Sequence, residues 1–155
     1  MKISQIQPWI DNNEANYINK VVKRGYLTEN KETSKFEKFF EKKFQINFAI
    51  SVSNWTLGIF ACLKALNIKK NDEVIVPNLT FVATINAIIL AGATPVICEV
   101  DDKNLSLDLN KVNSCISKKT KAIMPVHLYG HCCDMGELKR ICKKKNIVII
   151  EDAAQ

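Results

Sequence analysis

The spacing of hydrophobic positions changes repeatedly along the chain after residue 47. Runs that are apolar at nearly every position predict strands at residues 48–52, 73–76, 94–100, 121–126 and 147–150. Between these runs, apolar residues recur at helical spacing and predict helices at residues 56–66, 81–91, 109–116 and 135–144. Strands and helices therefore alternate in strict order.

This alternation predicts an α/β fold, because a helix joins two parallel strands by a right-handed crossover. Strands that are apolar on both sides are expected where helices cover both faces of a parallel sheet. We therefore predict a three-layer αβα arrangement with a mostly parallel sheet.

The first 47 residues have a different pattern. Residues 13–23 and 35–44 read as two amphipathic helices, separated by a polar turn at residues 25–32. Such a segment is too short to form its own core, so we expect it to pack on the sheet or on a partner subunit. The predicted organisation is a helical arm, 1–47, followed by an α/β domain, 48–155. Because residue 155 directly follows a predicted interior strand, we expect this domain to be incomplete.

Composition and charge narrow the class of protein. With 47% hydrophobic and 25% charged residues, the 155-residue chain is typical of a globular protein. The polar N-terminus does not resemble a signal peptide, and no run reaches the roughly 18 apolar residues that span a bilayer. We therefore expect a cytoplasmic protein without a membrane segment. The formal charge of +6 comes mostly from lysines that follow helices, and no basic stripe predicts nucleic-acid binding. The positive charge could attract a phosphorylated ligand.

Six cysteines raise the question of a disulfide framework or a metal site. No Cys-x-x-Cys pair occurs, and His127 and His131 are the two histidines. We expect reduced thiols in a cytosolic protein and no metal site.

Candidate ligand-binding residues follow the strands, because open α/β sheets bind ligands beyond the carboxyl ends of their strands. Those segments are residues 53–56, 77–81, 127–131 and 151–155. The turn from Ser53 to Leu57 leads directly into a helix. It can bind a phosphate through free amide N–H groups and the Thr56 hydroxyl, or Ser53 or Asn54 can simply cap the helix.

Asp152 follows the apolar run 147–150. A carboxylate so close to a core is costly without a cationic partner, which could be a metal, an arginine or a protonated pyridine nitrogen. The alternative is that Asp152 caps a helix. Phe81 could stack on a flat ring or could belong to the core. His127 and Tyr129 could act as acid and base, but no nucleophile accompanies them, so we interpret them as structural residues or as residues that support those of the site.

Together these segments resemble the DegT/DnrJ/EryC1/StrS family of sugar aminotransferases, which have the type I fold of pyridoxal 5′-phosphate (PLP) enzymes. The resemblance covers nearly the whole chain and is carried by residues 51–56, 72–77, 80–84, 92–96, 120–130 and 151–155, with Gly25 and the pair Phe36-Glu37 in the arm. Within the family, residues 125–130 and their surroundings most resemble the GDP-perosamine synthase subfamily. The chain would then be the N-terminal part of the large PLP-binding domain.

The resemblance implies a role for each matching residue. Asp152 would pair with the pyridine nitrogen, and Gln155 would bind the ring hydroxyl. Phe81 would stack on the ring, and Thr56 with the amide of Leu57 would hold the phosphate. One departure is Trp55, which stands where the family commonly has a small residue, often glycine.

The resemblance also implies an activity. The parent enzyme would transfer an amino group from an amino acid, expected to be glutamate, to a nucleotide-linked keto-deoxysugar for polysaccharide synthesis, such as O-antigen, and it would be a homodimer. The family's Schiff-base lysine lies downstream of residues 151–152, so this chain would hold no catalytic residue and be inactive alone. Lys64 and Lys121 lie away from the predicted edge and cannot replace it. Two alternatives remain: a PLP-dependent sugar dehydratase of the same fold, and a non-catalytic remnant.

Overall fold

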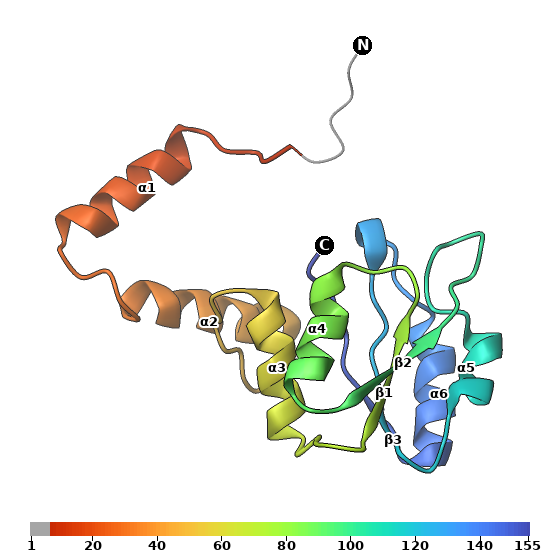
Figure 1. Ribbon diagram of the computed structural model, residues 1–155. Coiled ribbons are helices and arrows are strands. Elements are labelled where there is room, and N and C mark those ends of the chain that lie inside the picture. Colours follow the sequence, from red (N-terminus) through yellow and green to blue (C-terminus); the bar gives the residue numbers. More distant parts are fainter. Residues whose placement is uncertain (1–6) are drawn as a thin grey trace. The chain divides into compact units, whose positions relative to one another are not determined.

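The computed structural model describes residues 7–155 and divides into two compact units between Ser51 and Val52 (Figure 1). Residues 1–6 of the predicted arm lie outside the described residues. The first unit contains the helices α1 (Asn12–Lys23) and α2 (Lys31–Phe44). No residue of either helix is buried, so the two amphipathic helices have no core of their own.

Both helices of the first unit begin at side-chain caps. Asp11 accepts a hydrogen bond from the amide of Asn13 at 2.6 Å, while Glu14 accepts from the amide of Asp11 at 2.8 Å. Asn30 caps α2 by accepting from the amide of Lys31. The capping residues satisfy amide groups that have no partner inside the helix, which explains where each helix starts.

The second unit contains a four-stranded parallel sheet in the order β2-β1-β3-β4. The strands are β1 (Glu73–Pro77), β2 (Thr94–Cys98), β3 (Thr120–Ile123) and β4 (Val148–Ile149). The helices are α3 (Trp55–Ala65), α4 (Val82–Leu90), α5 (Leu109–Cys115) and α6 (Met135–Lys145), with the short 3-10 helix η1 (Leu128–Gly130) before α6.

The central strand β1 shows why helices cover both faces of this sheet. Val74 and Val76 point into one core, which contains Ile59 and Leu63 of α3 and residues of α4. Ile75, between them, points into the opposite core with residues of α5 and α6. Figure 1 shows α3 and α4 on one side of the strands and α5 and α6 on the other. The predicted three-layer αβα fold with a parallel sheet is confirmed.

One predicted strand is wrong. Residues 48–52 form no strand, and Phe48 and Ile50 are each 81% exposed. Instead of pairing with a neighbouring strand, the amide of Ser51 donates to the Glu37 carboxylate at 2.8 Å and that of Ala49 to Glu41 at 3.3 Å. An apolar run predicts a strand only where a partner strand can take up its backbone hydrogen bonds. Over residues 7–155, none of the helices has the length and apolar character needed to span a membrane.

Candidate active site

Asp152 lies at the carboxyl edge of the sheet, beyond the end of β4. Asp152 forms an isolated parallel bridge with Val126 beyond the ends of β3 and β4. Its amide donates to the carbonyl of Pro125 and its carbonyl accepts from the amide of His127, both at 2.9 Å. Only 5% of the residue is exposed. The backbone of Asp152 is therefore held through both its N–H and its C=O, and the residue is almost fully removed from solvent.

Two hydrogen bonds hold the Asp152 carboxylate. Its Oδ2 accepts from the Thr84 hydroxyl at 2.7 Å, and its Oδ1 accepts from the amide of Ala154 at 3.2 Å. Thr84 is fully buried on α4, and its hydroxyl lies 2.8 Å from that of Thr80. Because an ionised carboxylate only accepts, the proton of Thr84 points to Asp152 and the proton of Thr80 points to Thr84.

A pocket of about 260 Å³ opens beside this carboxylate. That volume is just below the roughly 300–1,000 Å³ typical of pockets that enclose drug-sized ligands. Four of the five predicted cofactor residues line it: Thr56, Phe81, Asp152 and Gln155. Leu57 is not among the lining residues. None of the described residues that line the pocket is Lys, Arg or His.

Phe81 is the N-cap residue of α4 and lines the mouth of the pocket. Its side chain is 70% exposed, and it belongs to neither of the two cores. The alternative that Phe81 is a core residue is therefore wrong. An exposed aromatic ring beside a pocket is available to stack on a flat ligand.

The start of α3 resolves part of the choice between capping and phosphate binding. Asn54 is the N-cap residue, and its side-chain oxygen accepts from the amide of Leu57 at 3.0 Å. The capping interpretation is confirmed for Asn54. A phosphate that used the Leu57 amide would have to displace the Asn54 side chain, whereas the Thr56 hydroxyl already lines the pocket.

Trp55 fits the first turn of α3 because Gly58 has no side chain. A Cβ atom on Gly58 would lie 2.6 Å from Cε3 of the indole, which packs against the core on the α3 side. Over residues 7–155, the indole Nε1 is the buried side-chain nitrogen or oxygen that has no hydrogen-bond partner. A buried donor without a partner is destabilising by about 1–3 kcal/mol.

Gln155 reaches the pocket with a defined amide orientation. Its side-chain oxygen accepts from the amide of Tyr129 at 3.1 Å, which leaves the NH₂ group as its free end. Tyr129 has a left-handed backbone (φ 54°) within η1 and presents its N–H to Gln155. A side-chain amide held in this way is a donor, as a ring hydroxyl or phenolate oxygen requires.

The side chain of His127 is held by hydrogen bonds, and its structural role stays a prediction. Its Nδ1 accepts from the amide of Cys133 at 3.3 Å, so the proton of the neutral ring lies on Nε2 and is donated to Glu151 at 3.0 Å. Both ring nitrogens are engaged and the residue is 7% exposed. The hydrogen bonds of His127 link η1, the start of α6 and the strand that ends at Asp152.

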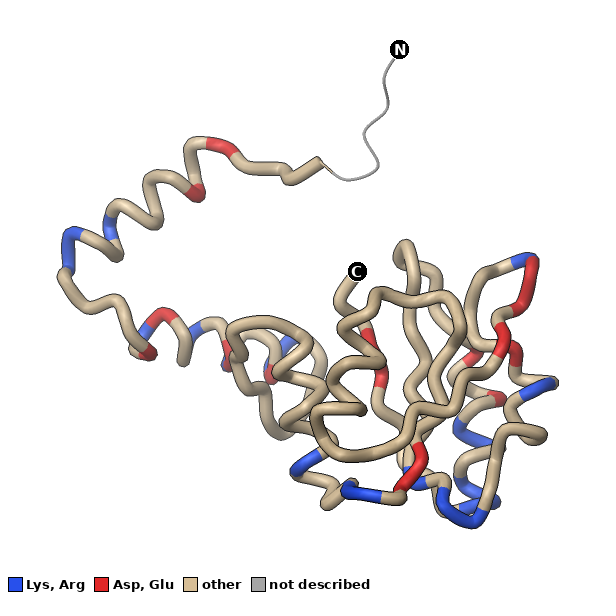
Figure 2. Tube along the Cα trace, viewed as in Figure 1, with Lys and Arg blue, Asp and Glu red and all other residues tan. Residues whose placement is uncertain are grey.

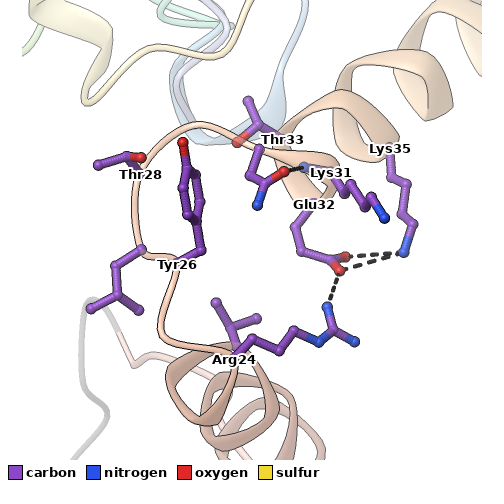
Figure 3. A pocket seen from close by; sticks show the side chains of 10 residues that line it. Arg24, Tyr26, Thr28, Lys31, Glu32, Thr33 and Lys35 are labelled. Carbon is purple, nitrogen blue, oxygen red and sulfur yellow. Dashed lines mark hydrogen bonds and ion pairs between the residues drawn. The ribbon is translucent and has the colours of Figure 1, made fainter.

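A second hollow lies within the first unit, between the end of α1 and the start of α2 (Figure 3). The Glu32 carboxylate accepts from Tyr17 and from Arg24, and it also pairs with Lys35 at 3.4 Å. The hydrogen bond from Tyr17 holds the pKa of Glu32 at about 2, with Arg24 as the next cause. Because Glu32 already pairs with Arg24 and Lys35, this hollow is a weaker candidate site than the pocket at Asp152.

Sequence reasoning assigned no role to Thr80 and Thr84, and it considered Asn54 only as a cap. Helical periodicity gave no signal for the threonine pair, because Thr80 precedes Phe81, the N-cap residue of α4. Thr84 is also 68 residues from Asp152 in sequence, so their contact depends on the fold.

Solved structures define the class of protein. The aminotransferase from Psychrobacter cryohalolentis superposes with a TM-score of 0.92 at 34% identity, covering 96% of this chain and 38% of that chain. NtdA from Bacillus subtilis, solved with its cofactor PMP (pyridoxamine phosphate), superposes with a TM-score of 0.89 at 33% identity, covering 94% of this chain and 34% of that chain. The fold is thus that of PLP-type aminotransferases, and the prediction of pyridoxal phosphate as their cofactor is confirmed.

Sequence comparison identifies the family more specifically than the fold does. GDP-perosamine synthase from Vibrio cholerae is 37% identical over 150 residues, which cover 96% of this chain and 41% of that enzyme. The profile of the DegT/DnrJ/EryC1/StrS aminotransferase family matches residues 8–155, and the chain belongs to this family. The predicted resemblance to GDP-perosamine synthases is also confirmed. The chain spans about two fifths of the length of these curated relatives.

Proposed function

We propose that this chain forms the part of a PLP-dependent sugar aminotransferase that holds the ring and the phosphate of the cofactor. The observation that carries this proposal is the Asp152 carboxylate. It is 5% exposed, lines a pocket at the carboxyl edge of a parallel sheet, and has no Lys, Arg or His beside it among the described lining residues. Such a carboxylate is costly unless a cation arrives with the ligand.

A protonated pyridine nitrogen fits that requirement. When bound, pyridoxal phosphate supplies an electron sink for the carbon that loses its proton. Asp152 would accept a hydrogen bond from the ring N–H and keep the nitrogen protonated. Phe81, exposed at the pocket mouth, would cover one face of the ring, and the Gln155 amide would donate to the ring oxygen.

The phosphate would bind at the start of α3, where unpaired amides and the helix dipole favour an anion. Thr56 would donate its hydroxyl. The Leu57 amide would join once the Asn54 side chain turns away.

The covalent lysine is proposed to lie outside residues 1–155. No lysine is among the described residues that line the pocket. Lys64 lies in the last turn of α3, and Lys121 lies at the start of β3, the end of that strand away from Asp152. The chain alone would then bind the cofactor without covalent attachment and would not transaminate.

For the whole protein we propose transfer of an amino group from an amino acid, glutamate by preference, to the keto group of a nucleotide-linked deoxysugar. The similarity to GDP-perosamine synthases supports this substrate class, and that to the spore coat polysaccharide biosynthesis protein SpsC of Bacillus subtilis supports a place in polysaccharide synthesis. Residues 1–47 would be a helical arm and residues 48–155 part of the large domain of a cytoplasmic homodimer.

Titration of the chain with pyridoxamine phosphate tests the cofactor proposal. This ligand has the ring nitrogen, ring hydroxyl and phosphate but no aldehyde, so it cannot form an imine with surface lysines. Trp55 lines the pocket and Trp9 does not, so the fluorescence of a Trp9→Phe background reports on the pocket. We expect saturable quenching, and Asp152→Asn in this background to weaken binding at least about tenfold through loss of a charge-assisted hydrogen bond.

Asp108→Asn is the matched control, because Asp108 is a carboxylate that caps α5 and does not line the pocket. It should leave the affinity within about twofold, a difference well under 1 kcal/mol. The proposal is abandoned if pyridoxamine phosphate does not quench, or if Asp152→Asn binds it as tightly as the parent chain.

A further inference from the structure

The hydroxyl pair Thr80–Thr84 lines the pocket beside Asp152 and has no role in the cofactor contacts proposed above. Thr84 is fully buried, and its hydroxyl donates its single proton to Asp152 Oδ2 at 2.7 Å. The Thr80 hydroxyl, 2.8 Å away, then donates to Thr84. The three side chains form a one-directional chain of hydrogen bonds that ends on the carboxylate.

This arrangement leaves the carboxylate few ways to turn. Oδ2 is held by Thr84 and Oδ1 by the amide of Ala154 at 3.2 Å, while the backbone of Asp152 is fixed by Pro125 and His127. A carboxylate has about four acceptor sites, so lone pairs remain for a ligand after both contacts are made. Thr84 is on α4 and Asp152 follows β4, so their contact also links these two elements at the pocket.

We propose that Thr84 is a positioning residue, which holds the Asp152 carboxylate in the orientation that accepts a hydrogen bond from the ring nitrogen of the cofactor. Thr80 supports Thr84 by taking up its remaining acceptor site, since hydrogen bonds in a chain strengthen one another. This inference rests on the proposed function, because it assumes that the ring nitrogen meets Asp152.

The decisive measurement compares two ligands on the same variants. One is pyridoxamine phosphate, and the other is its carbocyclic analogue, in which the ring N–H is replaced by C–H. Thr84→Val keeps the shape of the side chain and removes the hydroxyl. We expect Thr84→Val to weaken pyridoxamine phosphate about tenfold, and the analogue by less than about twofold.

Two further variants separate positioning from stability. Thr84→Ser restores the hydroxyl and should return the preference for pyridoxamine phosphate over the analogue to the parent value. Thr120→Val is the matched control, since Thr120 is 7% exposed, accepts a hydrogen bond from the Ser117 amide at 2.9 Å, and lies at the opposite end of β3. It should lower the stability of the fold without changing the ratio of the two affinities.

The outcomes distinguish this inference from the proposed function. If the parent chain binds pyridoxamine phosphate but Thr84→Val weakens both ligands equally, or neither, the positioning role is overturned and the cofactor site stands. Failure of Thr84→Ser to restore the ratio also overturns it. If the parent chain does not bind pyridoxamine phosphate at all, both proposals fall.

Discussion

At the scale of single residues, the first turn of α3 shows how one side chain depends on the absence of another. Trp55 is bulky, and its indole lies against Gly58. Glycine inside a helix is unfavourable by about 1 kcal/mol relative to alanine, so its place here is explained by the space it leaves. The pocket wall at Asn54 and Thr56 is therefore shaped by a residue one turn away.

Gly58→Ala should destabilise the fold even though alanine is the better helix former. Its Cβ would lie 2.6 Å and 2.9 Å from two atoms of the Trp55 ring, so the indole must leave its position against the core. We expect a loss of about 1–3 kcal/mol in the free energy of unfolding, measured by urea denaturation. In a Trp55→Ala background the loss should be much smaller, because the contact that remains is Val52 Cγ2 at 3.3 Å. A stabilising effect in both backgrounds would contradict this account.

At the scale of elements, α1 and α2 are joined by contacts to one carboxylate. Glu32 near the start of α2 accepts from Tyr17 on α1 and from Arg24, the C-cap residue of α1. The same hydrogen bond that lowers the pKa of Glu32 raises the pKa of Tyr17, because it favours ionised Glu32 and protonated Tyr17. These two helices have no buried residue, and the contacts to Glu32 are exposed to solvent.

The Glu32 contacts should weaken in acid at an unusually low pH. With its pKa lowered from 4.5 to about 2, they are fully present above pH 4.5 and are lost as the pH falls through about 2. Carboxyl ¹³C NMR of Glu32 should give a midpoint near 2, and Tyr17→Phe should raise that midpoint by removing the largest cause. A midpoint near 4.5 in the parent chain would refute the link between the helices.

At the scale of the whole molecule, the architecture of the second unit determines where its lysines and its buried cysteines lie. Lysines that follow α3 and α5, or that form the last turn of α6, precede β1, β3 and β4, and they gather along the edge where the strands begin (Figure 2). The pocket lies at the opposite edge and is lined by no Lys or Arg among the described residues. The lysines therefore complement helix C-termini, and attraction of a phosphorylated ligand by the overall positive charge stays a prediction.

The cysteines should react according to their layer. Cys98 at the end of β2 and Cys142 on α6 are buried in the core between the sheet and the helices α5 and α6, and desolvation raises their pKa to about 12 and about 11. A thiol with a raised pKa stays protonated at pH 8 and is a poor nucleophile. Iodoacetamide labelling followed by mass spectrometry should modify exposed Cys132 first, and Cys98 and Cys142 only where urea unfolds the domain. If Cys98 were labelled as fast as Cys132 in native buffer, the core between the sheet and the helices α5 and α6 would be accessible to solvent.

The helices, most strands and the position of Asp152 could be predicted from the sequence, because they depend on local periodicity and on the rule that ligands bind beyond strand ends. Capping by Asn54 was one of two local options, and the structure selected it through the Leu57 amide. The roles proposed for Thr56, Phe81 and Gln155 came from family resemblance, and the pocket places these residues beside Asp152.

The sequence by itself determined which segments form helices and strands, and it placed an acidic residue at the exit of an apolar strand. Only the tertiary structure decided that residues 48–52 form no strand, that Phe81 stays out of the core, and that Thr84 meets Asp152. The physical reason is the sequence separation between the residues that interact. Helices and caps are stabilised by neighbours within a few residues, whereas strand pairing and the contact across 68 residues exist only once the sheet order β2-β1-β3-β4 has formed.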